Sequence, residues 1–277
     1  MRRWQRLARC VRHGPCLAST ALARVRALPG AGLRDVLGGW AALVVAPHPD
    51  DESLGCGGLI AEAVRLGETV HVAVVTDGAG SHSESHTHRP ELLRQLRRSE
   101  TLEAAAVLGV PPERVSFLDI PDGRAPQHGA AAEAAGRRLA ALARDIAAGT
   151  IFTSWNYDTH PDHVAAHRYA AAAAREAQAS LFSYPVWAWM LPGRTLMPNL
   201  RWRGFSIDIG PHVAAKRAAV LRHRSQTTPL IADDPSGFTL SDAQLATMIT
   251  PKEFFIAENQ RAREFASRRA ANLAVAK

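Results

Sequence analysis

The chain has 277 residues, of which 47% are hydrophobic, 21% are charged and 6% are aromatic. This composition is typical of a globular protein with a sizeable core, and no run approaches the ~18 apolar residues of a membrane span. The formal charge of +7 comes entirely from residues 1–37, because the rest of the chain has equal numbers of basic and acidic residues. A neutral body argues against a nucleic-acid-binding protein.

The basic segment predicts an N-terminal extension, residues 1–38, in front of a single domain that spans residues 39–277. Arg24 and Arg26 interrupt its apolar stretch, so it lacks the apolar core of a secretory signal. We expect a solvated extension that catalysis does not need, and contact with an anionic membrane surface or an acidic partner is the alternative. An arginine-rich start is also typical of organelle transit peptides, but we favour a cytoplasmic protein.

Behind the extension, apolar runs alternate with segments of helical periodicity. Strands are predicted at 41–46, 69–76, 114–120 and 150–155, and helices at 57–67, 91–109, 130–149 and 161–178. Further on, "LFSYPVWAW" and "RGFSIDI" are strand candidates, while 212–224 and the tail from Pro251 are predicted to be helical. Alternating strands and helices predict βαβ units, and therefore an α/β fold with a mostly parallel sheet flanked by helices.

Two charged loops follow predicted strands of this sheet. "PHPDDE" comes directly after 41–46, and "DTHPDH" follows 150–155. The carboxyl ends of parallel strands lie at one edge of a sheet, where open α/β folds bind their ligands, so we expect the loops to converge. Adjacent carboxylates such as Asp50 and Asp51 repel each other unless a cation compensates them. Two histidines, one carboxylate and an open position form the usual catalytic zinc site, so the loops predict a shared metal.

Other polar side chains have simpler interpretations. Each cluster alone would more often be a surface or capping group, and Asp50, Asp51 or Ser53 could cap the following helix. Three cysteines without a C-x-x-C pair argue against a disulfide framework. His82, His86 and His88 are expected to lie in a solvated loop. His167 is expected to be a helix-surface or supporting group, and Cys56 a buried small residue.

The two motifs resemble the PIG-L/LmbE family of zinc-dependent N-deacetylases. The first motif is Ala46-Pro47-His48-Pro49-Asp50-Asp51-Glu52 and the second is "HPDH" at 160–163. Supporting matches are "VVTDGAGS" (74–81), "RRSETLEAAAVLGV" (97–110), "FLDIPDG" (117–123) and "KRAAVLRHRSQ" (216–226). The resemblance covers roughly residues 40–230 and implies a Rossmann-like sheet.

The resemblance implies a metal-binding set in these loops. His48, Asp51 and His163 match the ligands of one divalent ion, Zn²⁺, with iron as the alternative metal. Arg97 aligns with an arginine that contacts the substrate, and a salt bridge to Glu100 is the alternative for this side chain.

The resemblance also implies three catalytic side chains. Asp50 matches the general base, with Glu52 as the next candidate for that role. His160 matches the histidine that stabilises the tetrahedral intermediate, as a protonated ring, and Asp162 lies where a carboxylate would orient it.

The implied reaction is hydrolysis of the acetamide of an N-acetylated amino sugar, usually N-acetylglucosamine within a conjugate. The products are acetate and a free amine, and the partner is a small-molecule sugar or glycoconjugate. The alternatives are a metal-dependent amidohydrolase of another N-acyl substrate and a non-catalytic carbohydrate-binding relative. Tyr184, Trp187 and Trp189 could stack on a sugar, or belong to an ordinary core strand. The sequence does not separate nucleotide-, lipid- and thiol-linked sugars.

Overall fold

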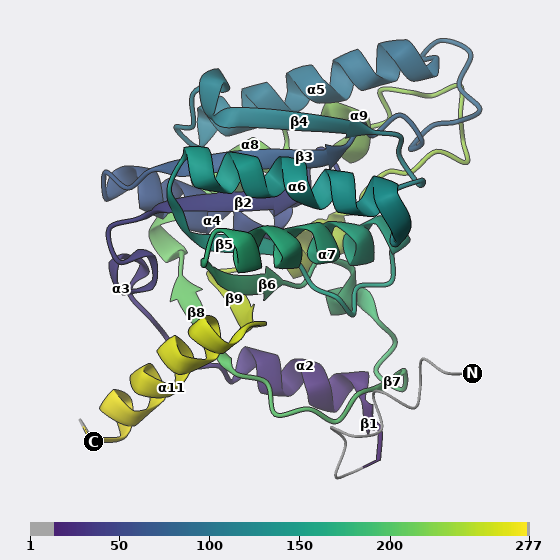
Figure 1. The fold of residues 1–277 in the computed structure, drawn as a ribbon. Coiled ribbons are helices and arrows are strands. Elements are labelled where there is room, and N and C mark those ends of the chain that lie inside the picture. The colour runs from purple at the N-terminus through teal and green to yellow at the C-terminus, as the bar shows by residue number, and fades with distance from the viewer. Residues whose placement is uncertain (1–13, 276–277) are drawn as a thin grey trace.

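The computed structural model describes residues 14–275, and a seven-stranded sheet lies at the centre of this part of the chain (Figure 1). The strand order is β4-β3-β2-β5-β6-β9-β8. The strands are β2 (Ala41–Ala46), β3 (Val70–Thr76), β4 (Val115–Ile120), β5 (Ala148–Ser154), β6 (Ser180–Tyr184), β8 (Gly204–Asp208) and β9 (Lys252–Ala257). The first five strands of this order, β4, β3, β2, β5 and β6, are parallel to one another, and β9 runs antiparallel to both β6 and β8. The expected α/β fold with a mostly parallel sheet is confirmed.

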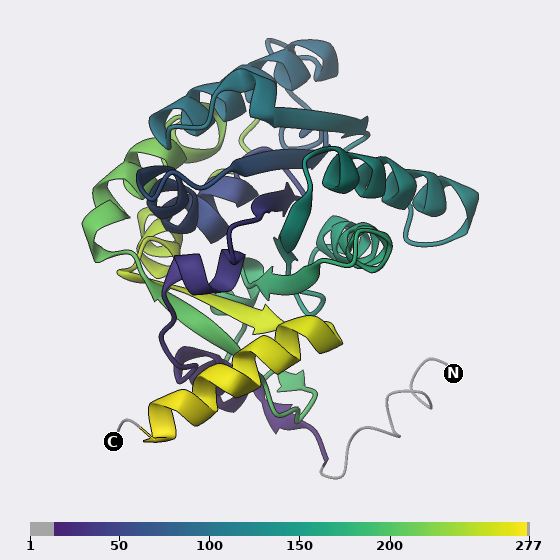
Figure 2. The ribbon, with the colours of Figure 1, turned by 60° about the vertical axis from the view of Figure 1, so that its left-hand side comes forward.

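Helices cover both faces of the sheet, as Figures 1 and 2 show. The main helices are α4 (Asp51–Arg65), α5 (Pro90–Val107), α6 (Gly129–Asp145), α7 (Pro161–Glu176) and α8 (Val213–Val220). Val44 of β2 belongs to the core shared with α4 and α8, whereas Leu43 and Val45 belong to the core under α6 and α7. A strand that is buried on both faces needs a continuous apolar run, which explains the sequence AALVVA.

Three predicted elements differ most from the structure. Helix α4 begins at Asp51, six residues before the predicted start at Gly57, so the Gly-rich stretch lies within the helix. A Cβ atom at Gly55 would lie only 2.1 Å from the Tyr184 ring, so glycine permits this helix to approach β6 closely. The predicted strand LFSYPVWAW ends at Tyr184 and continues as the 3₁₀ helix η2 (Trp187–Met190). The tail from Pro251 forms β9 before it becomes α11 (Gln260–Val275).

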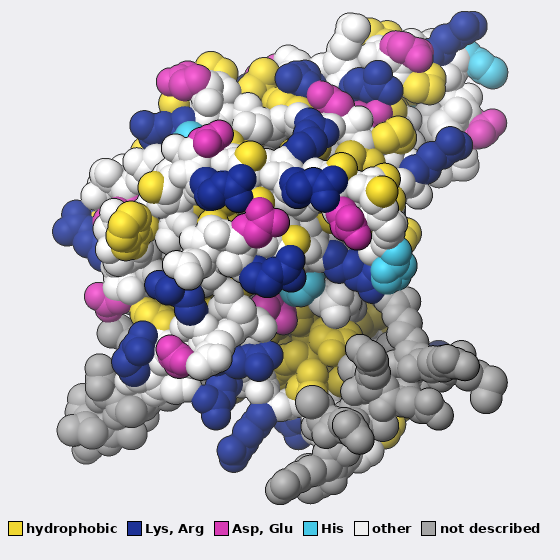
Figure 3. Space-filling view, viewed as in Figure 1, with side chains coloured by type: hydrophobic (Ala, Val, Ile, Leu, Met, Phe, Trp, Pro, Cys, Tyr) yellow, Lys and Arg dark blue, Asp and Glu magenta, His cyan; other side chains and the backbone are white. Residues whose placement is uncertain are grey.

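Smaller elements complete the described chain. They are β1 (Cys16–Leu17), α2 (Ala18–Arg26), α3 (Leu33–Leu37), η1 (Pro112–Arg114), β7 (Leu196–Met197), η3 (Gly210–His212), α9 (Arg224–Thr227) and α10 (Asp242–Met248). No helix of residues 14–275 combines the length and the apolarity that a membrane crossing requires. Figure 3 shows Lys and Arg side chains interspersed with Asp and Glu over the face that carries α6 and α7.

The N-terminal segment packs onto the domain from residue 16 onward. Ala18, Ala21 and Val25 of α2 are fully buried in a cluster that includes Trp155 and Ile256. Strand β1 pairs with β7, and α3 contributes its apolar side chains to the core beside α4. The expectation of a solvated extension is therefore wrong for this segment. The boundary at residue 38 stays a prediction, as does contact of the extension with a membrane or an acidic partner. Residues 1–13 of the extension lie outside the described residues.

Candidate active site

The two motif loops meet because their strands are neighbours. Strands β2 and β5 are hydrogen-bonded in parallel, so the loops that follow them leave the sheet at the same edge. His48 lies in the loop after β2, and Asp51 is the first residue of α4. His163 lies in the first turn of α7, which starts at Pro161, a favourable first helical residue. The expected convergence of these loops is confirmed.

The three expected ligands form a compact buried cluster. One ligand atom each from His48, Asp51 and His163 lie within 4.8 Å of one another. Asp51 Oδ2 is 3.2 Å from His48 Nδ1 and 3.2 Å from His163 Nε2. A second, overlapping group joins His48 to His160 and Asp162, but His160 is less buried than the members of the first group. The buried group is the better candidate for a metal.

His163 is oriented by a carboxylate that the sequence interpretation missed. Its Nδ1 lies 2.9 Å from Asp158 Oδ2. The Asp158 carboxylate also accepts hydrogen bonds from the backbone N–H groups of Val186 (3.1 Å) and Ala188 (2.9 Å). His163 Nε2 is buried and faces Asp51 Oδ2 at 3.2 Å, but it has no well-formed hydrogen bond among the described residues. A histidine whose other nitrogen faces a carboxylate is the usual metal-ligand arrangement, so the donor set fits a divalent ion.

Without a metal, the charges within this cluster shift one another's pKa values. Burial opposes the ionisation of Asp51, but the two imidazoles beside it outweigh burial and hold the pKa of this carboxyl below its ordinary value. Burial alone would lower the pKa of His163, yet Asp51 and Asp158 raise it to about 9. The pKa of His48 is likewise raised well above its ordinary value, because its carboxylate neighbours outweigh burial. In the metal-free protein His163 therefore holds a proton at neutral pH, which a metal would have to displace.

Asp50 has an unusual backbone conformation. Its φ of 134° and ψ of −28° lie in a region that residues other than glycine rarely adopt. Such strain persists only where neighbouring groups fix it, and it is concentrated at functional sites. Burial raises the pKa of the Asp50 carboxyl to about 7, against the opposing effect of Arg97. A carboxylate with this pKa suits proton transfer near neutral pH.

Arg97 is fixed beside Asp50. Its Nη1 donates to Gly78 O (3.0 Å) and its Nη2 to Pro49 O (2.5 Å), and Nη2 lies 3.3 Å from Asp50 Oδ2. Glu100 has different partners, because its carboxylate accepts hydrogen bonds from the backbone N–H and hydroxyl of Ser225. Arg97 and Glu100 therefore do not form the salt bridge that was the alternative for Arg97. Contact between Arg97 and a substrate stays a prediction.

The structure corrects the expected relation between Asp162 and His160. The Asp162 carboxylate accepts hydrogen bonds from the backbone N–H groups of Gly123 (2.7 Å) and Ala125 (3.1 Å), and Oδ2 lies 3.3 Å from His48 Nε2. Asp162 therefore faces His48 with its side chain and touches His160 only through its backbone N–H, which donates to His160 Nδ1 (3.2 Å). Local helix capping at His160 explains the difference, because Nδ1 caps the N-terminus of α7.

His160 is also less basic than expected. Burial and the neighbouring His48 and His163 lower the pKa of its imidazole below the ordinary value. The neutral ring accepts at Nδ1, so its proton resides on Nε2.

An open cleft of about 610 Å³ adjoins the cluster. Its charged and histidine lining consists of His48, Asp50, Asp51, Arg97, Asp122 and His160. The other lining residues are Gly80, Ser81, Gly123, Thr159, Trp187, Gln226, Ser236 and Phe238. Rings of Trp187 and Phe238 meet edge to face, with centroids 5.2 Å apart. Among the three aromatic candidates for sugar stacking, Trp187 lines this cleft.

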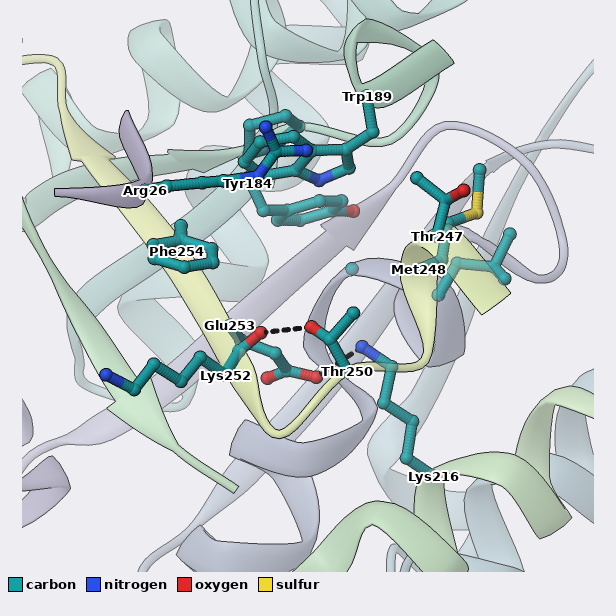
Figure 4. A pocket seen from close by; sticks show the side chains of 13 residues that line it. Arg26, Tyr184, Trp189, Lys216, Thr247, Met248, Thr250, Lys252, Glu253 and Phe254 are labelled. Atoms are coloured by element: carbon teal, nitrogen blue, oxygen red, sulfur yellow. Dashed lines mark hydrogen bonds and ion pairs between the residues drawn. The ribbon is translucent and has the colours of Figure 1, made fainter. Parts of the chain in front are cut away.

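The other two aromatic side chains belong elsewhere. Tyr184 is buried and donates its hydroxyl to Val45 O (2.9 Å). Trp189 lines a separate cavity of about 80 Å³, where Arg26 lies over its ring (Figure 4). The same cavity has the buried Lys216–Glu253 ion pair at its wall (Figure 4).

Several site residues were missed, and one could have been found. Asp122 Oδ1 lies 3.3 Å from His48 Nε2, and Asp122 follows β4, so the rule that placed the other loops also applies to it. The buried pair of Glu52 and His223 joins α4 to the link between α8 and α9, which is far from it in the chain, and residue spacing alone does not reveal this contact. Burial raises the pKa of Cys56, in agreement with the expected buried small residue.

Comparison with solved structures first defines the class of fold. The N,N'-diacetylchitobiose deacetylase of Pyrococcus horikoshii is similar with a TM-score of 0.57 and 22% identity, over 81% of this chain and 86% of that chain. GalB of Pseudomonas putida KT2440, the 4-carboxy-2-hydroxymuconate hydratase, is similar with a TM-score of 0.53 and 22% identity, over 68% of this chain and 80% of that chain. These likenesses show a shared fold, and their differing titles show that this fold supports more than one reaction.

The family follows from sequence. Residues 43–174 match the family model PIG-L, GlcNAc-PI de-N-acetylase. This stretch contains both motif loops and is similar to the PIG-L family, which confirms the expected resemblance.

Two curated relatives extend this likeness. The 1D-myo-inositol 2-acetamido-2-deoxy-alpha-D-glucopyranoside deacetylase of Mycolicibacterium vanbaalenii is 27% identical over 77% of this chain and 89% of its own length. The mycothiol S-conjugate amidase of Streptomyces coelicolor is 30% identical over 52% of this chain and 54% of its own length.

Proposed function

We propose that this protein hydrolyses the acetamide of an N-acetylated amino sugar or its conjugate, releasing acetate and a free amine. The observation that carries the proposal is the meeting of a buried His–Asp–His cluster with Asp50 and His160 at the wall of one cleft. The name of the Mycolicibacterium relative describes a deacetylase of an acetamido sugar, which supports this substrate class.

The metal site proposed here consists of His48, Asp51 and His163. Three protein ligands of this kind with an accessible cleft beside them suit a single catalytic Zn²⁺ ion. When bound, the ion supplies Lewis acidity to the substrate carbonyl and to the attacking water. Asp158 keeps Nε2 of His163 directed toward the cluster through its contact with Nδ1. Asp162 and Asp122 both face Nε2 of His48 and hold this ring in place.

Asp50 is the proposed general base. It adjoins the ligand Asp51 in sequence but lines the cleft, and Arg97 lies against one of its carboxylate oxygens. The carboxylate accepts the proton of the attacking water, while the Arg97 guanidinium limits its rotation. Glu52, the other candidate base, is fully buried and does not line the cleft, so its position favours Asp50.

His160 is the proposed oxyanion donor. Its Nδ1 accepts the backbone N–H of Asp162, so the neutral ring carries its proton on Nε2 and can donate it as a hydrogen bond. The ring lines the cleft beside His48, with centroids 4.5 Å apart. A donor fixed at this place stabilises negative charge as it develops on the former carbonyl oxygen. We propose a neutral donor here, in place of the protonated ring expected from the resemblance.

Trp187 is the proposed contact for the sugar or for the group attached to it. The ring forms part of the cleft wall and meets the ring of Phe238 edge to face. Flat aromatic rings offer sugars a large contact area with little loss of conformational freedom.

A metal measurement combined with acetate release tests the proposal. Purified protein and the His163→Ala variant are assayed for bound metal and for acetate released from a library of N-acetylamino sugars. We expect one equivalent of zinc and acetate release in the unaltered protein, and neither in the variant. A protein that holds no metal and releases no acetate would instead support the non-catalytic carbohydrate-binding alternative.

A second candidate function is hydrolysis of another amide. It is favoured by the name of the Streptomyces relative, an S-conjugate amidase. A panel of other N-acyl compounds in the same assay distinguishes it, because a metal-loaded protein that cleaves only these compounds contradicts the sugar proposal.

A further inference from the structure

The segment RHRSQ, residues 222–226, contacts three other segments of the chain and has no role in the proposed reaction. It runs from the end of α8 into α9, and the side chains of His223, Ser225 and Gln226 are fully buried. His223 contacts Glu52, Ser225 contacts Glu100, and Gln226 donates to the hydroxyl of Ser81. A buried segment with these three polar connections holds the surroundings of the cleft together.

Glu52 is the point where this segment reaches the proposed base. Glu52 Oε2 accepts the backbone N–H of Asp50 (3.1 Å), while Oε1 lies 3.0 Å from His223 Nε2 and accepts the hydroxyl of Ser53 (2.7 Å). Glu52 and His223 are both fully buried. The carboxylate therefore connects His223 directly to the backbone of Asp50.

The backbone of Asp50 is the strained part of the site. A φ of 134° requires neighbouring groups that outweigh the preference of an L residue for other conformations. Glu52 supplies one such contact at the Asp50 N–H, and Arg97 supplies another at the preceding carbonyl of Pro49. These two contacts hold the peptide group between residues 49 and 50 from both ends.

We propose that His223 is a positioning residue for Asp50. By holding the Glu52 carboxylate, it keeps the Asp50 N–H bonded and the residue in its strained conformation, which aims the Asp50 carboxylate into the cleft. His223 Nδ1 has no hydrogen-bond partner among the described residues, so Glu52 is the side-chain contact through which His223 acts. The catalytic part of this inference rests on the proposed function, whereas the conformational part does not.

The chain contains a matched control for this pair. His212 Nε2 lies 2.7 Å from Glu62 Oε2, and Glu62 also belongs to α4 while His212 immediately precedes α8. The His223–Glu52 and His212–Glu62 pairs therefore both join α4 to residues that flank α8, His212 before this helix and His223 after it, but only the former pair touches Asp50. Neither member of the control pair lines the cleft.

The test compares His223→Met, His223→Gln and His212→Met for metal content, thermal midpoint, kcat and KM. We expect His223→Met to bind the same amount of metal, keep its KM and lose ~10²-fold in kcat, the size of effect that misplacement by 1 Å can cause. His223→Gln retains a donor for Glu52 and should recover most of kcat. His212→Met should keep the kcat of the unaltered protein. A folded, metal-loaded His223→Met protein with unaltered kcat, or equal losses in both methionine variants, would overturn the proposal.

A crystal structure supplies a measurement that does not depend on activity. In His223→Met we expect Asp50 to leave the positive-φ region and its N–H to lose the contact with Glu52. Retention of both features would overturn the conformational part, even if the protein proved to have another activity. If His223→Met does not fold, Glu52→Met provides the second variant, because methionine offers no oxygen to the Asp50 N–H. We expect the same kcat loss and unchanged metal content, and unaltered kcat in Glu52→Met would also overturn the proposal.

Discussion

Two regions of the molecule bury charged side chains, and they do so in opposite ways. In the small cavity of Figure 4, the Glu253 carboxylate accepts Lys216 Nζ (2.7 Å) and the backbone N–H groups of Gly58 and Leu59 (2.8 Å each). At the candidate active site, His163 Nε2 faces Asp51 Oδ2 (3.2 Å) without a well-formed hydrogen bond among the described residues, and Asp50 is strained. A buried charge whose hydrogen bonds are all made stabilises the fold, whereas buried charges with incomplete hydrogen bonding beside a strained backbone indicate a site that binds a ligand.

Among variants that keep their metal, Asp50→Asn is expected to have the largest effect on turnover. This change preserves shape but removes the group that accepts a proton, so kcat should fall by ~10²–10⁴-fold. Metal content should remain that of the unaltered protein, because Asp50 is not among the proposed ligands. Steady-state kinetics and metal analysis of one sample check both points. Near-normal turnover would assign the base to another group.

His160→Ala should have the next largest effect. Loss of one oxyanion donor typically lowers the rate by ~10²–10³-fold, with little change in KM. The variant must also keep its full metal content, because His160, His48 and Asp162 form a second group that could hold a metal. A variant that loses its metal would show that His160 is a ligand.

Asp158→Asn should weaken metal binding rather than the chemical step. The change replaces the carboxylate that faces His163 Nδ1, and loss of such a partner typically costs 10–100-fold in metal affinity. Competition with a chelator of known affinity measures this change. At saturating zinc, kcat should return close to that of the unaltered protein, and an unchanged affinity would contradict the assigned orientation of His163.

Metal affinity should rise with pH up to about 9. Asp51 and Asp158 raise the pKa of His163 to about 9 in the metal-free protein, so the ring must lose a proton when it binds metal below that pH. Each released proton changes the affinity by about tenfold per pH unit. The same raised pKa contributes stability to the metal-free fold below pH 6.5, and this contribution is lost as the pH rises through 9. Calorimetry in buffers of different ionisation enthalpy measures the released protons, and pH-independent affinity between 6.5 and 8.5 would contradict this prediction.

The smallest effect at the active site is expected for Lys216→Met. It leaves the Glu253 carboxylate buried without its cation, which should lower the free energy of unfolding by ~3–5 kcal/mol. The folded fraction should keep its kcat, because this pair lies in the separate cavity. Denaturant unfolding combined with kinetics at low temperature checks both outcomes, and the Lys216→Met/Glu253→Gln double variant should recover part of the stability. A large loss of kcat in the folded protein would contradict the structural assignment.

The sequence was informative where short-range pattern decides the structure. The apolar run of β2 and the loop at His48 predicted a strand and a ligand at its carboxyl end, and both lie where the parallel sheet requires. The helical start at Asp51 was missed, because the glycines that disfavour a helix are required by the close approach of Tyr184. This contact joins residues that are far apart in the chain.

The supporting residues of the site were harder to predict for a related reason. Asp158 was visible within the loop NYDTH, but its contact with His163 depends on the turn between them and on the backbone of η2. The expected Asp162–His160 contact followed from sequence proximity, yet the Asp162 side chain faces His48 across the gap between the loops. Side-chain direction at a helix start therefore decides the partner, and residue spacing alone does not fix it.

The position of the N-terminal segment also has a consequence for the order in which the fold is completed. Cys16 and Leu17 pair with Met197 and Leu196, and Gly30 forms a bridge to Ser206. A ribosome synthesises these partners long after the segment itself, whereas β2, β3 and β4 can pair while the second half of the chain is still missing. The part of the described chain that is made first therefore reaches its final place only after the sheet beside it exists.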